Sequence, residues 1–406
     1  MKHFFFLTAC LFALQGAQAA EPLIYTFDSS AQQRFELHVP VPDGNYLVTM
    51  RIGSKRKAGR TFVKAETRRL YVNDLPTAKG EFKTVSFVVN KRDIHIRENG
   101  EIVADVTLKS REIGKYNWND SLDLEIGGDA PVVESITIEP AGPVTTIFLC
   151  GNSTVVDQDN EPWASWGQMF PWFFDTQVAV ANYAESGERA DTFIGAGRLR
   201  KILSLLNPGD YVFVEFGHND QKIADRPGGG AYYFFATQLK IFIDQIRAKG
   251  GIPVFLTPTH RRNFDAQGHV VESHGDFPAA MAWVASREQV PLIDLHAMSA
   301  RLYEALGVEN SKIAFVHYKA GDFPGMPRDV ADNTHFNPYG AFQLAKCVVG
   351  QLCASGLPIS KHTIHFDGFN PALPDPAESF RWPASPFRDV SVQRLEQEDA
   401  ATNIVK

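Results

Sequence analysis

The sequence of 406 residues contains only four cysteines and six methionines. Cys10 lies in the first 20 residues, and Cys150, Cys347 and Cys353 remain as an odd set that cannot pair completely within the chain. Cys347 and Cys353 are the pair most easily imagined, but helical geometry alone would not bring them together. Cys150 ends an apolar run and is expected to be a buried small hydrophobic residue. No cysteine spacing is typical of a metal site, so we predict none.

Positive charge and long apolar runs are also scarce. The 40 basic and 47 acidic side chains give a formal charge of -7, which leaves no basic field for nucleic acid. Beyond residue 20, no apolar run approaches the length of a membrane helix. Apolar residues make up 44% of the chain and charged residues 21%, as in ordinary globular proteins. We therefore predict a folded, soluble protein with enough residues for two hydrophobic cores.

The first 20 residues have the pattern of a cleaved export signal. Lys2 precedes a short apolar run, and small residues follow at Ala17 and Ala19. The mature protein is therefore predicted to be secreted or periplasmic. Leu7 to Cys10 also resembles a lipoprotein signal, which ranks second because Cys10 lies very early and the apolar run continues past it.

The chain between Leu23 and about Pro140 alternates between apolar and polar residues in short segments separated by turns. This pattern predicts an all-β sandwich over residues 21–142, ending at the Pro140-Ala141-Gly142-Pro143 linker. The expected strands are Phe35 to Val39, Tyr46 to Ile52, Thr84 to Val89, Asp93 to Arg97, Ile102 to Leu108, Ser121 to Ile126 and Val133 to Ile138.

Residues 143–356 instead alternate buried strands with helices, which indicates an α/β domain with a parallel sheet covered on both faces. The expected strands are Thr145 to Cys150, Val178 to Ala181, Tyr211 to Phe216, Pro253 to Thr257 and Pro291 to Asp294. The expected helices are Ile194 to Leu206, Tyr233 to Ala248, Pro278 to Glu288 and Pro338 to Cys353. The proline-rich tail over residues 357–406 is predicted to be extended, either wrapping the domain or mobile.

Four polar clusters follow strands or precede the last helix, where an α/β sheet places its reactive groups. They contain Ser153, Gly187, Asn219 and the pair Asp332 and His335. Each has an ordinary alternative: a helix N-cap, a plain turn, an Asx-turn and a surface histidine, respectively. Their coincidence supplies a nucleophile, oxyanion donors and an oriented base, which together predict a serine hydrolase.

These clusters resemble those of the SGNH (GDSL-type) hydrolases, in the ordered blocks Gly151-Asn152-Ser153-Thr154, Gly187, Gly217-His218-Asn219-Asp220 and Asp332-Asn333-Thr334-His335. Further segments resemble the rhamnogalacturonan acetylesterase group, namely Trp163 to Gln168, Thr257 to Asp265 and His274 to Asp276. The resemblance covers roughly residues 144–353. It implies a three-layer, flavodoxin-like parallel sheet and removal of acetyl groups from pectin-type polysaccharide.

The resemblance also implies the roles of individual residues. Ser153 would be the nucleophile, His335 the general base and Asp332 the residue that orients it. The oxyanion hole would consist of the backbone N–H groups of Ser153 and Gly187 and the side chain of Asn219. His218 and Asp220 are left as structural neighbours, and no metal or organic cofactor is required.

One position departs from the family, which usually has Asp before the nucleophile, whereas this chain has Asn152. The amide keeps most of the hydrogen-bonding shape and loses the charge.

Substrate contacts are predicted at four residues. Trp163 and Trp166 could stack on sugar faces, and Arg261 and Arg262 could pair with galacturonate carboxylates. The alternatives are core packing for the tryptophans and a solvated loop for the arginines. The N-terminal half resembles galactose-binding-like sandwiches of carbohydrate-active enzymes, and it would either bind glycan or buttress the catalytic domain.

The predicted function is that of an exported serine esterase that removes O-acetyl groups from plant cell-wall polysaccharide, through an acetyl-enzyme intermediate. Its partner would be acetylated rhamnogalacturonan or a related polysaccharide or oligosaccharide. The alternatives are a lipase or thioesterase of the same superfamily, a glycan-binding protein with an inactive hydrolase half, and a structural surface protein.

Overall fold

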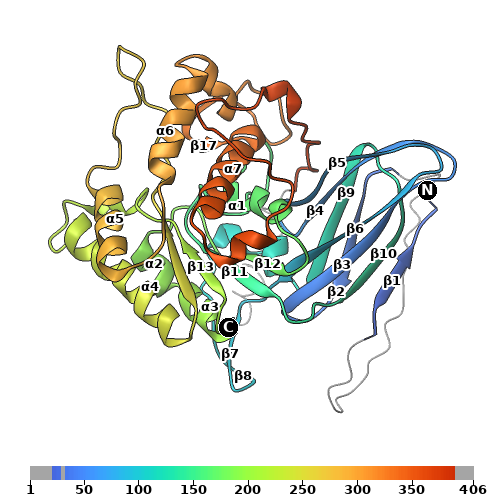
Figure 1. Cartoon of the computed structure of the whole chain (residues 1–406), viewed down its shortest axis with the longest axis horizontal. Coiled ribbons are helices and arrows are strands. Elements are labelled where there is room, and N and C mark those ends of the chain that lie inside the picture. Colours follow the sequence, from blue (N-terminus) through green and yellow to red (C-terminus); the bar gives the residue numbers. More distant parts are fainter. Residues whose placement is uncertain (1–20, 29–32, 389–406) are drawn as a thin grey trace, which may run out of the picture.

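The computed structural model of the chain describes residues 21–28 and 33–388 (Figure 1). The predicted export signal, Cys10 and the last 18 residues of the predicted tail lie outside the described residues. The described part forms two halves that lie side by side, one made of strands and one in which helices cover a sheet.

The N-terminal half is made of strands and two short 3-10 helices, η1 (Ser110–Glu112) and η2 (Tyr116–Trp118). Its strands are β1 (Leu23–Thr26), β2 (Phe35–Pro40), β3 (Gly44–Gly53), β4 (Gly59–Ala65), β5 (Arg69–Thr77), β6 (Phe82–Lys91), β7 (His95–Glu98), β8 (Glu101–Asp105), β9 (Ser121–Ala130) and β10 (Val133–Pro140). β1, β10, β3 and β6 lie in one sheet and β2, β9, β4 and β5 in another, and one hydrophobic cluster holds side chains of both. β7 and β8 form a separate hairpin.

The sequence pattern did not predict β1, β4 and β5. β4 and the first half of β5 are buried on both faces, so their residues do not alternate between apolar and polar. Charged side chains inside them, such as the buried Lys64 and Arg69, obscure the apolar pattern further.

The C-terminal half contains a parallel sheet whose five strands have the spatial order β12-β11-β13-β14-β15. The strands are β11 (Thr145–Cys150), β12 (Val178–Asn182), β13 (Tyr211–Val214), β14 (Ile252–Leu256) and β15 (Leu292–Ile293). Numbered along the chain this is the order 2-1-3-4-5 of flavodoxin-like folds, as predicted.

Helices cover both faces of this sheet, which gives three layers (Figure 1). Ile147 and Leu149 of β11 contact one cluster, while Phe148 and Cys150 contact the other. The first cluster includes side chains of α1 (Trp166–Met169), η3 (Phe170–Phe173), α6 (Leu295–Leu306) and α7 (Pro338–Ala354). The second includes side chains of α2 (Ala190–Gly195), α3 (Arg198–Leu205), η5 (Ala231–Phe235), α4 (Ala236–Ala248) and α5 (Phe277–Glu288).

Cys150 is buried, as predicted. Cys347 and Cys353 are both free, the first buried and the second exposed.

Two details of the α/β half differ from the prediction. The helix expected from Ile194 to Leu206 is two helices, α2 and α3, separated at Gly197, whose φ of 78° lies in the left-handed region that favours glycine. The segment before α7 is not a loop but a hairpin of β16 (Phe315–Tyr318) and β17 (Val330–Phe336). His335 therefore lies on a strand.

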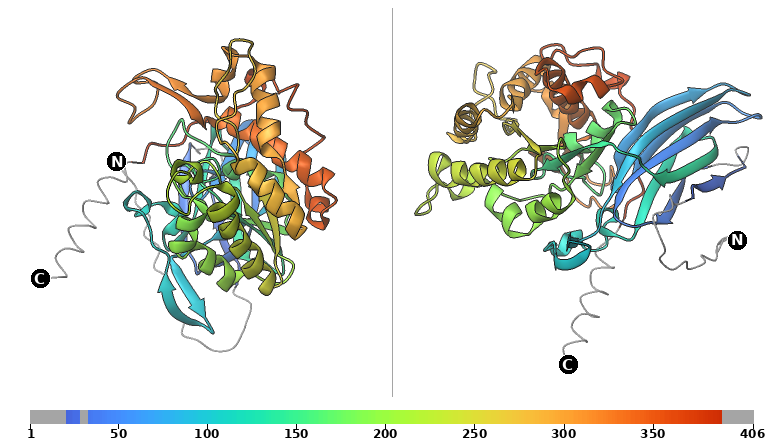
Figure 2. Two further views of the ribbon diagram at one scale, coloured as in Figure 1. Left: turned by 90° about the vertical axis from the view of Figure 1, so that its left-hand side faces the viewer. Right: turned by 60° about the horizontal axis from the view of Figure 1, so that its bottom comes forward.

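The two halves are joined through a shared sheet and buried charges. β6 pairs with β12, in parallel, at Val89 and Val180, so one nine-stranded mixed sheet crosses the molecule (Figure 2). Three buried ion pairs join the halves: Arg69 with Asp157 at 2.7 Å, Arg68 with Glu161 at 2.5 Å and Glu112 with Arg198 at 2.5 Å. Because a buried charge without a partner is costly, each pair disfavours separation of the halves.

The described part of the tail wraps the molecule. It contains the short helices η7 (Pro358–His362) and η8 (Ala377–Ser379) and then runs back to the N-terminal half (Figure 1). There the buried Lys64 donates hydrogen bonds to the Pro383 carbonyl at 2.6 Å and to Ser385 Oγ at 2.9 Å. The Trp382 ring covers the same ammonium at 3.9 Å and its Nε1 donates to Glu161 at 2.8 Å.

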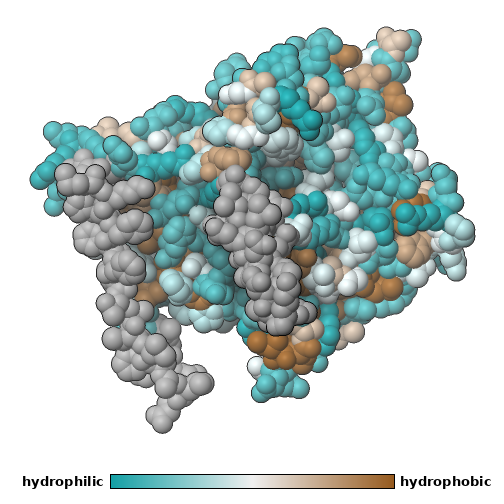
Figure 3. Space-filling model, turned by 180° about the vertical axis from the view of Figure 1, so that it is seen from behind, coloured by the Kyte–Doolittle hydropathy of each residue, from teal (hydrophilic) through white to brown (hydrophobic). Residues whose placement is uncertain are grey.

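One face of the molecule is mostly hydrophilic, with hydrophobic residues in small separate areas (Figure 3). Such scattered apolar areas are usual on a surface in contact with water. Among the described residues, no helix combines the length and apolar character that crossing a bilayer requires.

We expect Trp382→Ala to lower the free energy of unfolding by about 2 kcal/mol, because it removes a cation–π contact and a hydrogen bond to a buried carboxylate. Urea unfolding of the wild type and the variant measures this. The control is Trp283→Ala, at a tryptophan that is 46% exposed, where we expect a loss of about 1 kcal/mol or less. Equal losses in the two variants would show that the tail contact does not stabilise the fold.

Candidate active site

Ser153 lies in a tight turn directly after β11. The turn is closed by backbone hydrogen bonds from Val155 and Val156 to the Asn152 carbonyl. A Cβ atom at Gly151 would lie 2.5 Å from the Val155 side chain, so only glycine fits there. The strand and the turn thus hold Ser153 at the carboxyl edge of the sheet.

His335 meets Ser153 from the β16–β17 hairpin. Its Nε2 lies 2.8 Å from Ser153 Oγ, and its Nδ1 lies 2.7 Å from a carboxylate oxygen of Asp332. The other carboxylate oxygen accepts the backbone N–H groups of Thr334 and His335, at 2.8 and 3.0 Å. Since the carboxylate can only accept, Nδ1 carries the proton and Nε2 is left to accept the serine hydroxyl.

Asp332 remains ionised in this arrangement. Burial opposes the charge, but the hydrogen bonds from His335 and from the Thr334 backbone outweigh it and lower the pKa of Asp332. Asp332 and His335 are partly exposed, with side-chain accessibilities of 24% and 30%, so a substrate can reach the histidine.

The predicted oxyanion donors lie on two neighbouring loops. Gly187 is exposed and has a φ of 76°, in the left-handed region that favours glycine. One N–H of the Asn219 amide donates to the Glu188 carbonyl at 3.0 Å, which leaves the second N–H for a ligand. Asp220 joins the loops, because its carboxylate accepts the backbone N–H groups of Gly217 and Ala190 at 2.8 and 2.9 Å.

The N-terminal half holds the Gly187 loop in place through two cations. Lys109 donates to the Ser186 carbonyl at 2.7 Å and pairs with Glu188 at 2.5 Å. Arg111 pairs with Glu185 at 2.6 Å and also donates to the Ser186 carbonyl. The peptide unit between Ser186 and Gly187, which includes the Gly187 N–H, is therefore held by side chains from outside the α/β half.

Glu215, a buried carboxylate behind Ser153, was not predicted from the sequence. It accepts hydrogen bonds from Thr154 Oγ1 and Trp166 Nε1, both at 2.6 Å, and burial raises its pKa to about 7. Glu215 directly follows β13, but it stood inside the strand expected from Tyr211 to Phe216, so the available signal was a carboxylate within an otherwise apolar run.

Asn152 belongs to the same network and not to the line of Ser153, His335 and Asp332. Its Oδ1 lies 3.2 Å from the Thr154 backbone N and 3.0 Å from Thr154 Oγ1. Its Nδ2 is buried with no hydrogen-bond partner among the described residues. Asn152, which stands where the resembled family usually has aspartate, therefore affects the turn that carries Ser153 and not the contacts of His335.

Two of the four predicted substrate contacts are wrong. Trp166 is 1% exposed and lies in a hydrophobic core, where its ring nitrogen serves Glu215. Arg262 is 8% exposed, and its guanidinium is bound to Ser311, Asn333 and the Val308 carbonyl. A side chain in the core cannot stack on a sugar, and each of the three Arg262 guanidinium nitrogens already donates a hydrogen bond within the protein.

The other two predicted contacts are partly exposed. Arg261 donates to the carbonyls of Ser273 and His218, at 2.8 and 3.1 Å, and the Trp163 carbonyl accepts from Arg68 at 2.8 Å. Both residues are thus anchored close to the loops of the site.

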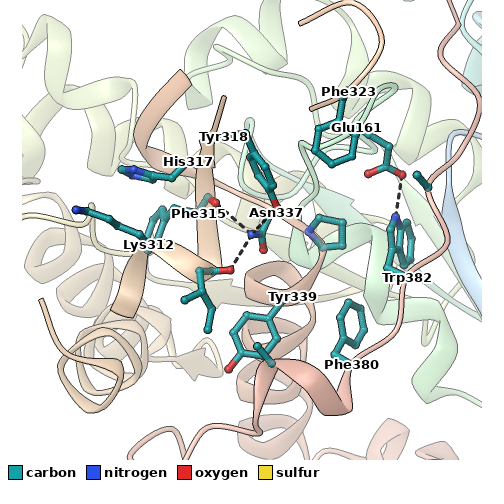
Figure 4. A pocket seen from close by; sticks show the side chains of 14 residues that line it. Glu161, Lys312, Phe315, His317, Tyr318, Phe323, Asn337, Tyr339, Phe380 and Trp382 are labelled. Atoms are coloured by element: carbon teal, nitrogen blue, oxygen red, sulfur yellow. Dashed lines mark hydrogen bonds between the residues drawn. The ribbon is translucent and has the colours of Figure 1, made fainter. Parts of the chain in front are cut away.

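A pocket of about 450 Å³ lies beside the hairpin that carries His335, between β16, the start of α7 and the tail (Figure 4). The Asn337 side-chain nitrogen lies in it, 3.1 Å from Tyr318 Oη and 2.7 and 3.1 Å from two backbone carbonyls, and the hydrogen bond from Trp382 to Glu161 borders it. None of the residues that line it is Ser153, Asp332 or His335. The pocket is thus adjacent to the site and separate from it.

An ordered serine, histidine and aspartate at the carboxyl edge of a flavodoxin-like sheet is the arrangement of a carboxylic ester hydrolase. Residues 146–341 match the model of the GDSL-like lipase/acylhydrolase family. The chain is also 40% identical, over 224 residues, to rhamnogalacturonan acetylesterase RhgT of Bacillus subtilis, covering 55% of this chain and 95% of that protein. The chain belongs to the GDSL-like lipase/acylhydrolase family, and the resemblance seen in the sequence is confirmed.

Two further comparisons concern other relatives. The rhamnogalacturonan acetylesterase of Emericella nidulans is 24% identical over 245 residues, which cover 56% of this chain and 92% of that protein. The uncharacterized esterase YxiM of Bacillus subtilis is 25% identical over 351 residues, 85% of this chain and 81% of that protein. The crystal structure of the YxiM protein matches with a TM-score of 0.47 at 23% identity, covering 82% of this chain and 83% of that one.

Glu215 gives the first testable prediction for the site. Between pH 4.5 and about 7 the Glu215 carboxyl is deprotonated in the unfolded chain but still protonated in the folded chain. The free energy of unfolding therefore falls as the pH rises through this range, and above pH 7 the folded protein carries the full cost of burying the charged carboxylate. Glu215→Gln removes the penalty, while its amide can donate to Thr154 and its carbonyl can accept from Trp166.

We expect Glu215→Gln to gain about 2 kcal/mol more over the wild type at pH 8 than at pH 5, with an upper bound of about 3 kcal/mol. Urea unfolding at the two pH values measures the difference. An equal effect at both values would mean that Glu215 is charged throughout this range.

Proposed function

We propose that this chain is a carbohydrate O-acetyl esterase that acts on acetylated rhamnogalacturonan or a similar pectin-type polysaccharide. The observation that carries the proposal is the hydrogen-bonded line from Ser153 Oγ through His335 to Asp332, at 2.8 and 2.7 Å. The names of the relatives, among them rhamnogalacturonan acetylesterases of two organisms, support the acetylated-pectin substrate.

In the proposed mechanism, Ser153 Oγ attacks the acetyl carbonyl while its proton passes to His335 Nε2. The negative charge on the carbonyl oxygen is stabilised by the backbone N–H groups of Ser153 and Gly187 and by the free amide N–H of Asn219. His335 then gives its proton to the departing sugar oxygen, which leaves an acetyl-enzyme. Water, deprotonated by the same nitrogen, then attacks the acetyl carbonyl. The bond to Ser153 Oγ breaks, His335 returns the proton to this oxygen, and acetate is released.

Asp332 contributes by holding the tautomer. Because Nδ1–H is bound to a carboxylate that stays ionised, the imidazolium formed in each step is stabilised and the ring cannot turn.

The test is acetate release from acetylated rhamnogalacturonan and from acetylated xylan by the wild type, Ser153→Ala and Asp332→Asn. We expect faster release from rhamnogalacturonan, and a loss of at least about 10⁴-fold in kcat for each variant. Long-chain p-nitrophenyl esters provide the comparison with lipase activity.

Three outcomes would contradict the proposal. Faster turnover of long-chain esters than of acetyl esters would indicate a lipase. Faster acetate release from xylan than from rhamnogalacturonan would indicate that xylan is the substrate. Binding of acetylated pectin without acetate release, by a folded wild type, would indicate a glycan-binding protein.

A second prediction concerns the oxyanion loop. Arg111→Ala removes one of the two cations on the Ser186 carbonyl, so the Gly187 N–H is less well placed for the transition state. We expect kcat to fall roughly tenfold with little change in KM, since the loss affects the transition state more than ground-state binding.

The control for that variant is Arg200→Ala, which breaks an exposed ion pair with Glu98 and touches no loop of the site. A similar fall in kcat for Arg200→Ala, or a change in KM alone for Arg111→Ala, would argue against a positioning role.

For the rest of the chain we propose the organisation predicted from the sequence: an export signal in residues 1–20, an accessory galactose-binding-like sandwich in residues 21–142, the hydrolase domain in residues 143–356 and the tail. The contacts of Lys109, Arg111, Arg68 and Arg69 with the loops of the site support a buttressing role for the N-terminal half.

A further inference from the structure

Three histidines and a glutamate gather beside the loop that carries Asn219, outside the line of Ser153. They are His260, Glu272, His274 and His296, and one ligand atom of each lies within 4.8 Å of the others. His260 follows β14, Glu272 and His274 precede α5, and His296 is in the first turn of α6. Cysteine spacings could not reveal this cluster, and its four residues are spread too widely along the chain to form a recognisable motif.

Both ring nitrogens of His296 face oxygen atoms that can only accept hydrogen bonds. Its Nδ1 lies 2.7 Å from the Pro258 carbonyl, which can only accept, so Nδ1 carries a proton. Its Nε2 lies 2.7 Å from Glu272 Oε2, which as a carboxylate also only accepts. A neutral imidazole would therefore direct a lone pair at a negative oxygen, and either a second proton or a metal ion must lie between them.

His260 supplies an independent observation. It is 7% exposed, and its Nδ1 is buried with no hydrogen-bond partner within residues 21–28 and 33–388. Leaving such a nitrogen unbound costs free energy, so a ligand for it is expected. Its ring stacks face to face on that of His296, with the centroids 3.5 Å apart, so the two histidines are in direct contact in the cluster.

His274 is fully buried, and its two ring nitrogens face different groups. Nε2 contacts Nδ1 of His218, while Nδ1 lies 3.3 Å from Ser273 Oγ and 3.8 Å from Glu272 Oε1. If Nε2 donates to His218, Nδ1 presents a lone pair toward the carboxylate. His274 and His296 would then each bind an ion through one nitrogen and donate a hydrogen bond through the other, as metal-binding histidines usually do.

We propose that His260, Glu272, His274 and His296 bind one divalent transition-metal ion of the Zn²⁺ class. Three imidazoles and a carboxylate are ligands that Zn²⁺ accepts, and four of them complete a tetrahedral shell. Bonds of about 2.0 Å set the ligand atoms of a tetrahedral site about 3.3 Å apart. On binding, His296 Nε2 and Glu272 Oε2, now 2.7 Å apart, must therefore separate, while ligand atoms that lie up to 4.8 Å apart must draw together. Because Glu272 is half exposed, an ion can enter from solvent.

This ion would be structural. It would tie the loop after β14 and the segment before α5 to α6, and through the contact of His274 with His218 it would brace the loop that carries Asn219. The proposed chemistry of Ser153 uses none of the four ligands, so the metal site and the esterase activity can be tested separately.

The experiment uses the full-length chain after treatment with a chelator that is then removed. Zn²⁺ titrated by calorimetry should bind with one ion per chain, and it should raise the melting temperature because it binds only the folded state. Co²⁺ in place of Zn²⁺ should give the visible absorption of a four-coordinate site.

The variants test the ligands. Glu272→Gln should weaken Zn²⁺ binding at least about tenfold, and His260→Ala and His296→Ala should abolish it. The matched control is His269→Ala, at a histidine of the same segment whose side chain is 73% exposed, and it should bind like the wild type. Since Glu272 is half exposed, its variant should fold even if the histidine variants do not.

Absence of saturable Zn²⁺ and Co²⁺ binding by the folded wild type would overturn the proposal and assign a second proton to His296. Binding that is equally strong in Glu272→Gln would also overturn it, and so would equal losses in Glu272→Gln and His269→Ala.

Discussion

The hydrogen bond between Ser153 and His335 is the contact on which the candidate site depends. It joins residues 182 positions apart at 2.8 Å, so the turn after β11 and the β16–β17 hairpin must be fixed relative to each other. A backbone hydrogen bond from Ala164 to the Phe336 carbonyl, at 2.8 Å, does this next to the histidine. The loop that follows Ser153 is therefore held against the strand that carries His335.

The loop that follows Ser153 is also held by the N-terminal half. Asp157 and Glu161 lie a few residues after Ser153 and pair with the buried Arg69 and Arg68. The Gly187 loop is held similarly by Lys109 and Arg111. Since a cation and its buried partner must stay together, the β-stranded half and the loops of the site form one unit.

Two carboxylates in this unit have pKa values shifted in opposite directions. Asp332 is ionised because hydrogen-bond donors surround it, and it orients His335. Glu215 lies deeper, where burial raises its pKa to about 7, and it joins Thr154 to Trp166. Asn152, at the position where the resembled family usually has aspartate, adds no second negative charge to this network, although its Nδ2 has no hydrogen-bond partner in the described part of the chain.

The sequence alone predicted the α/β order, the strands that precede the first three polar blocks and the loops that carry Ser153, Gly187 and Asn219, but it placed His335 on a loop and not on β17. These depend on local periodicity and on the rule that reactive loops follow parallel strands. Burial on both faces hid β4 and β5, and the tryptophan and arginine segments could not show which side chains face solvent. Tertiary structure alone decided that Trp166 lies in the core, that Glu215 supports the nucleophile's turn, and that His260, Glu272, His274 and His296 meet. The reason is physical: local pattern reports which face of an element is apolar, whereas the partners of a buried polar group come from distant parts of the chain.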